Sequence, residues 1–131
     1  MIRFVLAFAL FGSLAVSQAQ AQNRAFSCQS NIGGAVPRLG PVHHASVAIC
    51  PPGASPVVNA NGRGYSNPAC TFYGTQPGGS KFLVESYRVD VTCRTSQVPA
   101  SVVQRRVDSY NLPFKLFSNN CQHAASQATR K

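Results

Sequence analysis

Five cysteines constrain what this chain of 131 residues can fold into. In an oxidising compartment, cysteines at this density usually pair, and their disulfides stabilise a domain that is too small for a large core. Five is an odd number, so at least one thiol stays unpaired in a monomer. The spacing leaves open which cysteine this is and how the others pair; the five are Cys28, Cys50, Cys70, Cys93 and Cys121.

The first 21 residues have the three parts of a cleavable secretory signal peptide. Arg3 gives a positive start, residues 4–16 form an apolar run, and Ala19-Gln20-Ala21 supplies small residues for a signal peptidase. The apolar run is 13 residues long, short of the ~20 that a membrane-spanning helix needs. We expect cleavage after residue 21, although a retained anchor helix is the alternative. The expected product is one small domain, residues 22–131, secreted or periplasmic and without a transmembrane anchor.

The charge of the chain is strongly unbalanced. The formal net charge is +9, and only three acidic residues are present: Glu85, Asp90 and Asp108. A basic exported protein is attracted to anionic partners such as cell-wall polymers, lipopolysaccharide, lipid headgroups or nucleic acid. The basic residues are scattered, with no run longer than two, which is typical of a solvated surface. We therefore expect an anionic envelope polymer as partner and no specific nucleic-acid site.

Hydrophobic alternation predicts several strands. Residues 42–49, V-H-H-A-S-V-A-I, are alternating and rich in β-branched side chains. Residues 56–58 begin a short second strand, and Asn61-Gly62 is a hairpin-turn signal. Residues 82–93 show the clearest alternation with a period of two. Together these segments predict a small antiparallel sheet.

The remaining segments predict helices and irregular connections. Residues 98–107 carry valines on one side of a short helix, and residues 121–128 have good helical content after an Asn-rich cap. Residues 22–41 are polar and contain a turn signal, and residues 62–80 are rich in Gly, Pro, Asn and Ser. The predicted fold class is α+β, with a C-terminal helix that carries Cys121.

Two features suggest chemistry. Cys121 begins the last predicted helix, where backbone N–H groups and the helix dipole lower the pKa of a thiol. His44 lies on the first predicted strand, opposite the face of Val47 and Ile49, and an imidazole can take and return the proton of the thiol. This pattern predicts Cys121 as nucleophile and His44 as base, with His43 as the base if the register differs by one residue.

Other interpretations of these residues remain open. The two histidines could instead form a polar pair facing solvent, and Cys121 could belong to a disulfide. Ser46 and Asn59 are candidates for a third residue that orients the histidine. The chain has no C-x-x-C pair, and we expect neither a metal nor a cofactor.

Two blocks of sequence resemble a known superfamily. Residues 110–123, Y-N-L-P-F-K-L-F-S-N-N-C-Q-H, resemble the Y-x-L…N-N-C-x-H motif of circularly permuted papain-like enzymes, and residues 44–49, H-A-S-V-A-I, are similar to their histidine strand. These enzymes include lecithin–retinol acyltransferase-like proteins and PPPDE-type peptidases, and they are related to NlpC-type cell-wall peptidases. Ala124 stands where the superfamily usually has an aromatic residue.

The resemblance implies a permuted papain-like fold and a Cys-His dyad. It implies that Cys121 is the nucleophile, that its backbone N–H contributes to an oxyanion hole, and that His123 is not catalytic. The implied function is an exported hydrolase or acyltransferase that cleaves an amide, ester or thioester, such as a bond in a cell-wall peptide. We expect the protein to be a monomer. One alternative is an inactive binding module or inhibitor of the same fold. A second is a small basic nuclease or toxin that uses His44 and His123.

Overall fold

The computed structural model describes residues 22–36, 40–116 and 118–131, so the predicted signal peptide lies outside the described residues. Strands make up the first two thirds of the described chain, and helices follow them. The elements are β1 (Arg24–Val36), β2 (Gly40–Cys50), β3 (Val57–Ala60), β4 (Arg63–Ser66), β5 (Thr71–Gly74), β6 (Leu83–Val84), β7 (Thr92–Thr95), α2 (Ala100–Ser109) and α3 (Cys121–Thr129).

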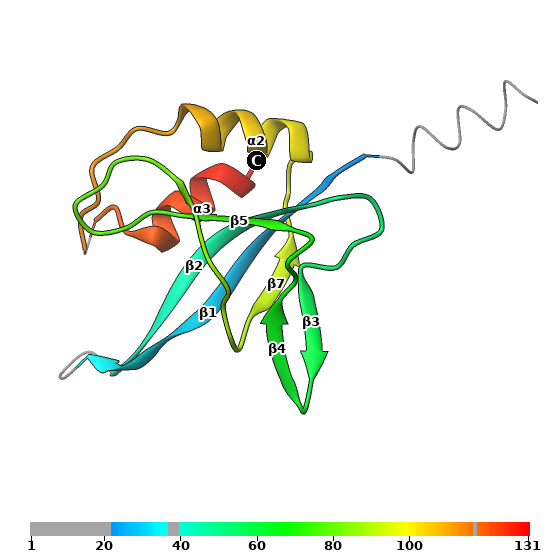
Figure 1. The fold of residues 1–131 in the computed structure, drawn as a ribbon. Coiled ribbons are helices and arrows are strands. Elements are labelled where there is room, and N and C mark those ends of the chain that lie inside the picture. The colour runs from blue at the N-terminus through cyan, green and yellow to red at the C-terminus, as the bar shows by residue number, and fades with distance from the viewer. Residues whose placement is uncertain (1–21, 37–39, 117) are drawn as a thin grey trace, which may run out of the picture.

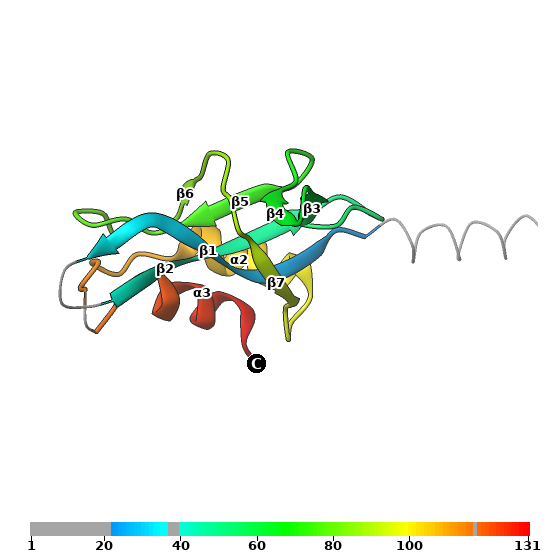
Figure 2. The same cartoon turned by 90° about the horizontal axis from the view of Figure 1, so that it is seen from below.

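The main sheet has five strands in the order β6-β5-β2-β1-β7, and every pairing in it is antiparallel. Its centre is the long hairpin of β1 and β2, which lie side by side in both views (Figures 1 and 2). Strands β3 and β4 form a separate two-stranded hairpin that projects from the sheet (Figure 1). The fold is therefore α+β with a small antiparallel sheet and a C-terminal helix that begins at Cys121, as the sequence predicts.

Alternation along β2 divides the core into two clusters, because successive side chains of a strand point to opposite faces of the sheet. Val47 and Ile49 face α2 and α3, where they pack with alanines and valines of the two helices. Ala48 and Cys50 face the other side and pack with Phe26 and Phe72, among others. The predicted strand 42–49 is confirmed, and so is the side on which Val47 and Ile49 enter the core.

Four of the five cysteines form two disulfides. Cys28 of β1 bonds to Cys93 of β7, the residue directly opposite in the ladder. Cys50 at the end of β2 bonds to Cys70, immediately before β5. Cys121 is free. The expected disulfides are therefore present, their pairing is settled, and the interpretation in which Cys121 belongs to a disulfide is wrong.

The predicted strand over residues 82–93 is wrong in its middle. Only Leu83–Val84 and Thr92–Thr95 are strands. Between them the chain runs beside the β3–β4 hairpin, where Val91 N–H donates to the carbonyl of Gly64. Asp90 has a φ of 55° there, and its carboxylate accepts two hydrogen bonds from Arg63. This ion pair and turn override the alternating pattern.

Two predicted irregular segments contain strands. β1 runs through most of residues 22–41, with a register irregularity between Asn31 and Ala35 in place of the predicted turn. Strands β4 and β5 lie within residues 62–80. The polar and glycine-rich composition of these segments shows no alternating pattern. β1 and β4 pair with strands that are neighbours in sequence, whereas β5 pairs with the more distant β2, to which the Cys50–Cys70 disulfide also ties it.

The hairpin turn and both helices occur near their predicted positions. Asn61 and Gly62 join β3 to β4 with φ values of 51° and 75°, the left-handed conformation that a tight hairpin turn requires. α2 is shifted by two residues from its predicted bounds, since Pro99 lies just before its first residue as N-cap. α3 begins where the sequence predicts and extends one residue further, to Thr129.

Candidate functional site

The thiol of Cys121 lies at the first residue of α3, and the preceding residue caps that helix. The side chain of Asn120 accepts hydrogen bonds from the N–H groups of Gln122 at 3.0 Å and His123 at 3.3 Å. The ring of His123 returns to Asn120 and completes a capping box. This explains the Asn-Cys-x-His spacing locally: Asn120 and His123 fix the helix start, which places Cys121 in the positive field of the helix N-terminus.

Polar side chains before α3 organise the connecting loop through hydrogen bonds. Tyr110 donates from its hydroxyl to the side chain of Asn119 at 3.1 Å, and Asn119 donates to the carbonyl of Pro113 at 2.9 Å. Asn120 donates in the same way to the carbonyl of Leu116 at 2.9 Å. The Tyr110 ring packs edge-on against Phe82, with centroids 4.9 Å apart. The loop is thereby attached to the segment that leads into β6.

The sulfur of Cys121 lies at an edge of β2 where no neighbouring strand pairs with it. β2 pairs with β5 only at residues 47–49. Ala45 lies two residues before Val47, so its N–H points toward the same edge of β2. That N–H donates to Sγ of Cys121 at 3.5 Å. Because β5 ends at Gly74, the edge of β2 is open for the thiol.

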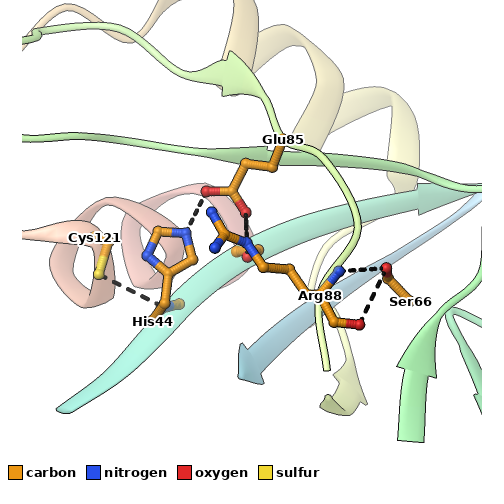
Figure 3. A network of polar contacts seen from close by, with 7 residues as sticks. His44, Ser66, Glu85, Arg88 and Cys121 are labelled. Carbon is orange, nitrogen blue, oxygen red and sulfur yellow. Dashed lines mark hydrogen bonds and ion pairs between the residues drawn. The ribbon is translucent and has the colours of Figure 1, made fainter. Parts of the chain in front are cut away.

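His44 lies beside this sulfur on β2, and its ring stands between Cys121 and Glu85 (Figure 3). The residue is only 8% exposed. The expectation that His44 lies on the face opposite Val47 is confirmed, but the expectation that this face is open is wrong, because Glu85 and the end of β5 cover the ring.

Glu85 completes the site from the position directly after β6, where its N–H donates to the carbonyl of Phe72 in β5. Its carboxylate bonds through Oε1 to Nε2 of His44, and its side chain is fully buried. The second oxygen, Oε2, accepts from the Ser46 hydroxyl at 2.9 Å and lies 3.6 Å from Nε of Arg88. A buried carboxylate is costly unless it is paired and hydrogen-bonded. The hydrogen bonds with His44 and Ser46 and the ion pair with Arg88 meet that need. Figure 3 shows His44 and Arg88 at the two carboxylate oxygens.

Charges within the site favour a thiolate and an imidazolium. Burial lowers the pKa of His44, but hydrogen bonding to Cys121 and Glu85 outweighs it and raises that pKa to about 9. Burial opposes ionisation of Cys121, but His44 and the N–H of Ala45 outweigh it and lower the pKa of the thiol. Each charge stabilises the other, so the two groups titrate as a coupled pair. The carboxylate of Glu85 stabilises the imidazolium of His44 from the side of the ring remote from Cys121.

The structure brings together some predicted site residues and separates others. His44 and Cys121 are in contact, and the Ser46 hydroxyl donates to the carboxylate of Glu85. His43 lies in β2 opposite Asn31, and its side chain lies outside the described ones. Asn59 belongs to the separate β3–β4 hairpin.

Glu85 was missed by the sequence analysis. It lies in the segment whose alternation predicts a continuous strand, and a regular strand there gives no reason for its carboxylate to meet His44. One signal was available: the chain has only three acidic residues, and any carboxylate that orients a histidine had to be one of them.

Residues 22–36, 40–116 and 118–131 contain no group of three His, Cys, Asp or Glu side chains that could hold a metal ion. No helix within these ranges has the length and apolar character needed to cross a membrane. The two disulfides fit an oxidising, extracellular environment.

Comparison with models of known protein families, with curated proteins and with solved structures found no match to this chain.

Proposed function

We propose that this chain is an exported thiol hydrolase or acyltransferase that cleaves an amide, ester or thioester. In this proposal Cys121 is the nucleophile, His44 is the general base and acid, and Glu85 orients His44. The observation that carries it is the free thiol at a helix N-terminus, beside an imidazole whose other nitrogen bonds to a buried carboxylate. A nucleophile, a base and an orienting group in this sequence of contacts are the signature of covalent catalysis.

The chemistry follows from the charges. The thiolate of Cys121 attacks the carbonyl carbon of the substrate, and the carbonyl π electrons move to the oxygen. The tetrahedral intermediate collapses, and the imidazolium of His44 transfers its proton to the leaving amine, alcohol or thiol. The resulting thioester on Cys121 is then attacked by water or by a second acceptor, whose proton His44 takes. Water gives hydrolysis, and another acceptor gives acyl transfer.

The start of α3 supports charge development on the substrate oxygen. The first N–H groups of a helix have no intrahelical partner, and Cys121 is the first residue of α3. We assign its backbone N–H to the oxyanion hole, in agreement with the resemblance to permuted papain-like enzymes. One such donor contributes about 3 kcal/mol to the stabilisation of the transition state in related chemistry.

The alternatives lose support from the same geometry. An inactive member of the fold has no need of a buried Glu85 on the ring of His44, and burying that carboxylate has an energetic cost. A nuclease that uses two histidines is disfavoured because His123 participates in the cap of α3. The basic charge and the disulfides favour a substrate in the envelope, such as a cell-wall peptide, and a secreted or periplasmic location.

The test combines thiol labelling with turnover. We expect iodoacetamide to label Cys121 rapidly in the folded, oxidised protein, and p-nitrophenyl acetate to release a burst of one equivalent of nitrophenolate. Cys121→Ala should abolish both signals, and His44→Ala should abolish the burst. Full activity of both variants on esters, thioesters and peptide amides would overturn the assignment. If Cys121 instead reacts slowly with iodoacetamide and its thiol has an ordinary pKa near 8.5, the result would favour the inactive binding module.

A further inference from the structure

A groove lies along α3, between that helix and strands β1 and β7. Its volume is about 440 Å³, within the range of pockets that bind small ligands. Ala45 and Gln122 line one end, and these residues are the amide partner and the chain neighbour of Cys121. Arg94 of β7 and Arg130 after α3 line the part remote from the thiol. The groove therefore begins beside the nucleophile and leads toward two guanidinium groups.

A smaller hollow continues this groove across the β1–β7 ladder. It has a volume of about 230 Å³ and shares Ser27, Gln29 and Arg94 with the larger one. The shared residues make the two hollows one surface, with Arg94 at the junction. Figure 2 shows α3 next to β2, and β7 next to β1 at the edge of the sheet.

The lining has the chemistry of an anion site. Among the described residues that line it, none is acidic and none is aromatic, and most of the others are Gln, Ser or Thr. Both arginines are exposed, and the ion pairs of the described residues involve neither of them. Arg130 donates to the Ser126 hydroxyl at 3.2 Å, which holds it along the groove. Guanidinium groups recognise carboxylates through paired N–H donors.

The spacing suits a peptide. Gln122 lies in the first turn of α3, and Arg130 directly follows the helix eight positions later. At 1.5 Å per helical residue this separation corresponds to about 12 Å. An extended peptide covers about 3.3 Å per residue, so three to four peptide residues span the groove. Nucleic acid is a poorer fit, because single strands are usually held by stacking on aromatic side chains and the described lining has none.

We propose that this groove binds an acidic peptide segment, whose carboxylates contact Arg94 and Arg130 about three residues from the bond that Cys121 attacks. This names the substrate class of the proposed enzyme, and only the link to Cys121 rests on that proposed function. The groove itself is lined by its own residues, which include neither Cys121 nor His44.

The binding experiment uses Cys121→Ala, so that no turnover occurs. The ¹⁵N-labelled protein is titrated by NMR with a capped tetraglutamate peptide and, separately, with the matched tetraglutamine peptide. We expect tetraglutamate to shift the amides of Ser27, Arg94 and Ser126, and tetraglutamine to bind at least tenfold more weakly. Arg94→Gln and Arg130→Gln should each weaken tetraglutamate binding about fivefold, the effect of one exposed ion pair.

Control variants and competitors decide the outcome. Arg105→Gln removes the same charge from the exposed surface of α2, and we expect less than a twofold change. Equal losses in Arg105→Gln and Arg94→Gln would reduce the effect to net charge and overturn the proposal. So would equal binding of the two peptides, displacement of tetraglutamate by millimolar inorganic phosphate, or tighter Arg94-dependent binding of oligothymidylate. Iodoacetamide labelling of Cys121 is measured separately in the wild type. Absence of peptide binding at the groove can therefore be distinguished from absence of reactivity at Cys121.

Discussion

A Cβ on Gly74 would lie 2.9 Å from Nε2 of His44 and would overlap the carboxylate of Glu85. The last residue of β5 therefore covers the contact between these two side chains and leaves no room for a methyl group. We expect Gly74→Ala to displace Glu85 from the ring, to slow iodoacetamide labelling of Cys121, and to lower the free energy of unfolding by about 1–3 kcal/mol through overpacking. Labelling rates and guanidinium denaturation measure the two effects.

Gly79→Ala is the matched control for this variant. A Cβ on Gly79 meets only the carbonyl of Gln76, at 3.4 Å, which is ordinary contact. We expect wild-type labelling and nearly wild-type stability. If Gly74→Ala labels as fast as Gly79→Ala, the close packing at Gly74 does not position the site.

The coupled charges predict the pH dependence of turnover. The thiolate forms as pH rises through the lowered pKa of Cys121, and the imidazolium is lost as pH rises through about 9, the pKa of His44. The step that protonates the leaving group needs both, so kcat/KM should rise to a plateau, reached below the ordinary thiol pKa, and fall again near pH 9. A profile that increases continuously up to pH 10 would contradict the pair.

Removal of the imidazole of His44 should return the pKa of the Cys121 thiol toward its ordinary value. In His44→Gln we expect the pKa of Cys121 to rise and the labelling rate at pH 7 to fall about tenfold for each pKa unit recovered. The pH dependence of labelling, followed by mass spectrometry, measures this. His123→Gln is the control, because glutamine suits the same position of a capping box and should leave the labelling rate unchanged.

Neutralising Glu85 should act through His44. In Glu85→Gln the imidazolium loses its buried carboxylate, so we expect the pKa of His44 to fall from about 9 toward its ordinary value, and kcat to fall more than KM rises. Ring resonances in an NMR pH titration measure the pKa directly. Asp108→Asn removes an exposed acid from α2 and should change neither quantity. An unchanged His44 titration in Glu85→Gln would exclude the orienting role.

The two disulfides should differ in their contribution to stability. Cys28–Cys93 closes a loop with a sequence separation of 65, and Cys50–Cys70 closes one of 20. In the chain-entropy account these loops correspond to about 4 and about 3 kcal/mol. We therefore expect the Cys28→Ala/Cys93→Ala protein to be less stable in guanidinium than the Cys50→Ala/Cys70→Ala protein. The reverse order would show that local packing, rather than loop length, decides the contribution.

Sequence reasoning found the parts of the site that local patterns specify. The alternation around His44 and the cap before Cys121 are each contained in one short segment, and the structure places both as predicted. The Asn-rich cap could be predicted because the hydrogen bonds of Asn120 are local, whereas the part of His123 in the capping box was not predicted. The fold class followed from the same strands and helix.

Glu85 and Arg88 could not be found in this way, because their positions depend on contacts distant in sequence. The chain turns away from the sheet after Val84 and pairs loosely with the β3–β4 hairpin. The ion pair between Arg63 and Asp90, which lie 27 residues apart, fixes this path of the chain. No local sequence pattern predicts that ion pair. The pairing of Cys28 with Cys93 is equally non-local, and the sequence left it open.

The two layers of the core have one more consequence. Cys28, Cys50 and Cys70 are buried in the cluster on one face of the sheet, whereas Cys121 packs against the cluster on the other face. Thiol–disulfide exchange needs a thiolate to reach a bridged sulfur directly, and the backbone of β1 and β2 stands in between. The sheet therefore separates the free thiol of Cys121 from both disulfides, which disfavours thiol–disulfide exchange within one chain.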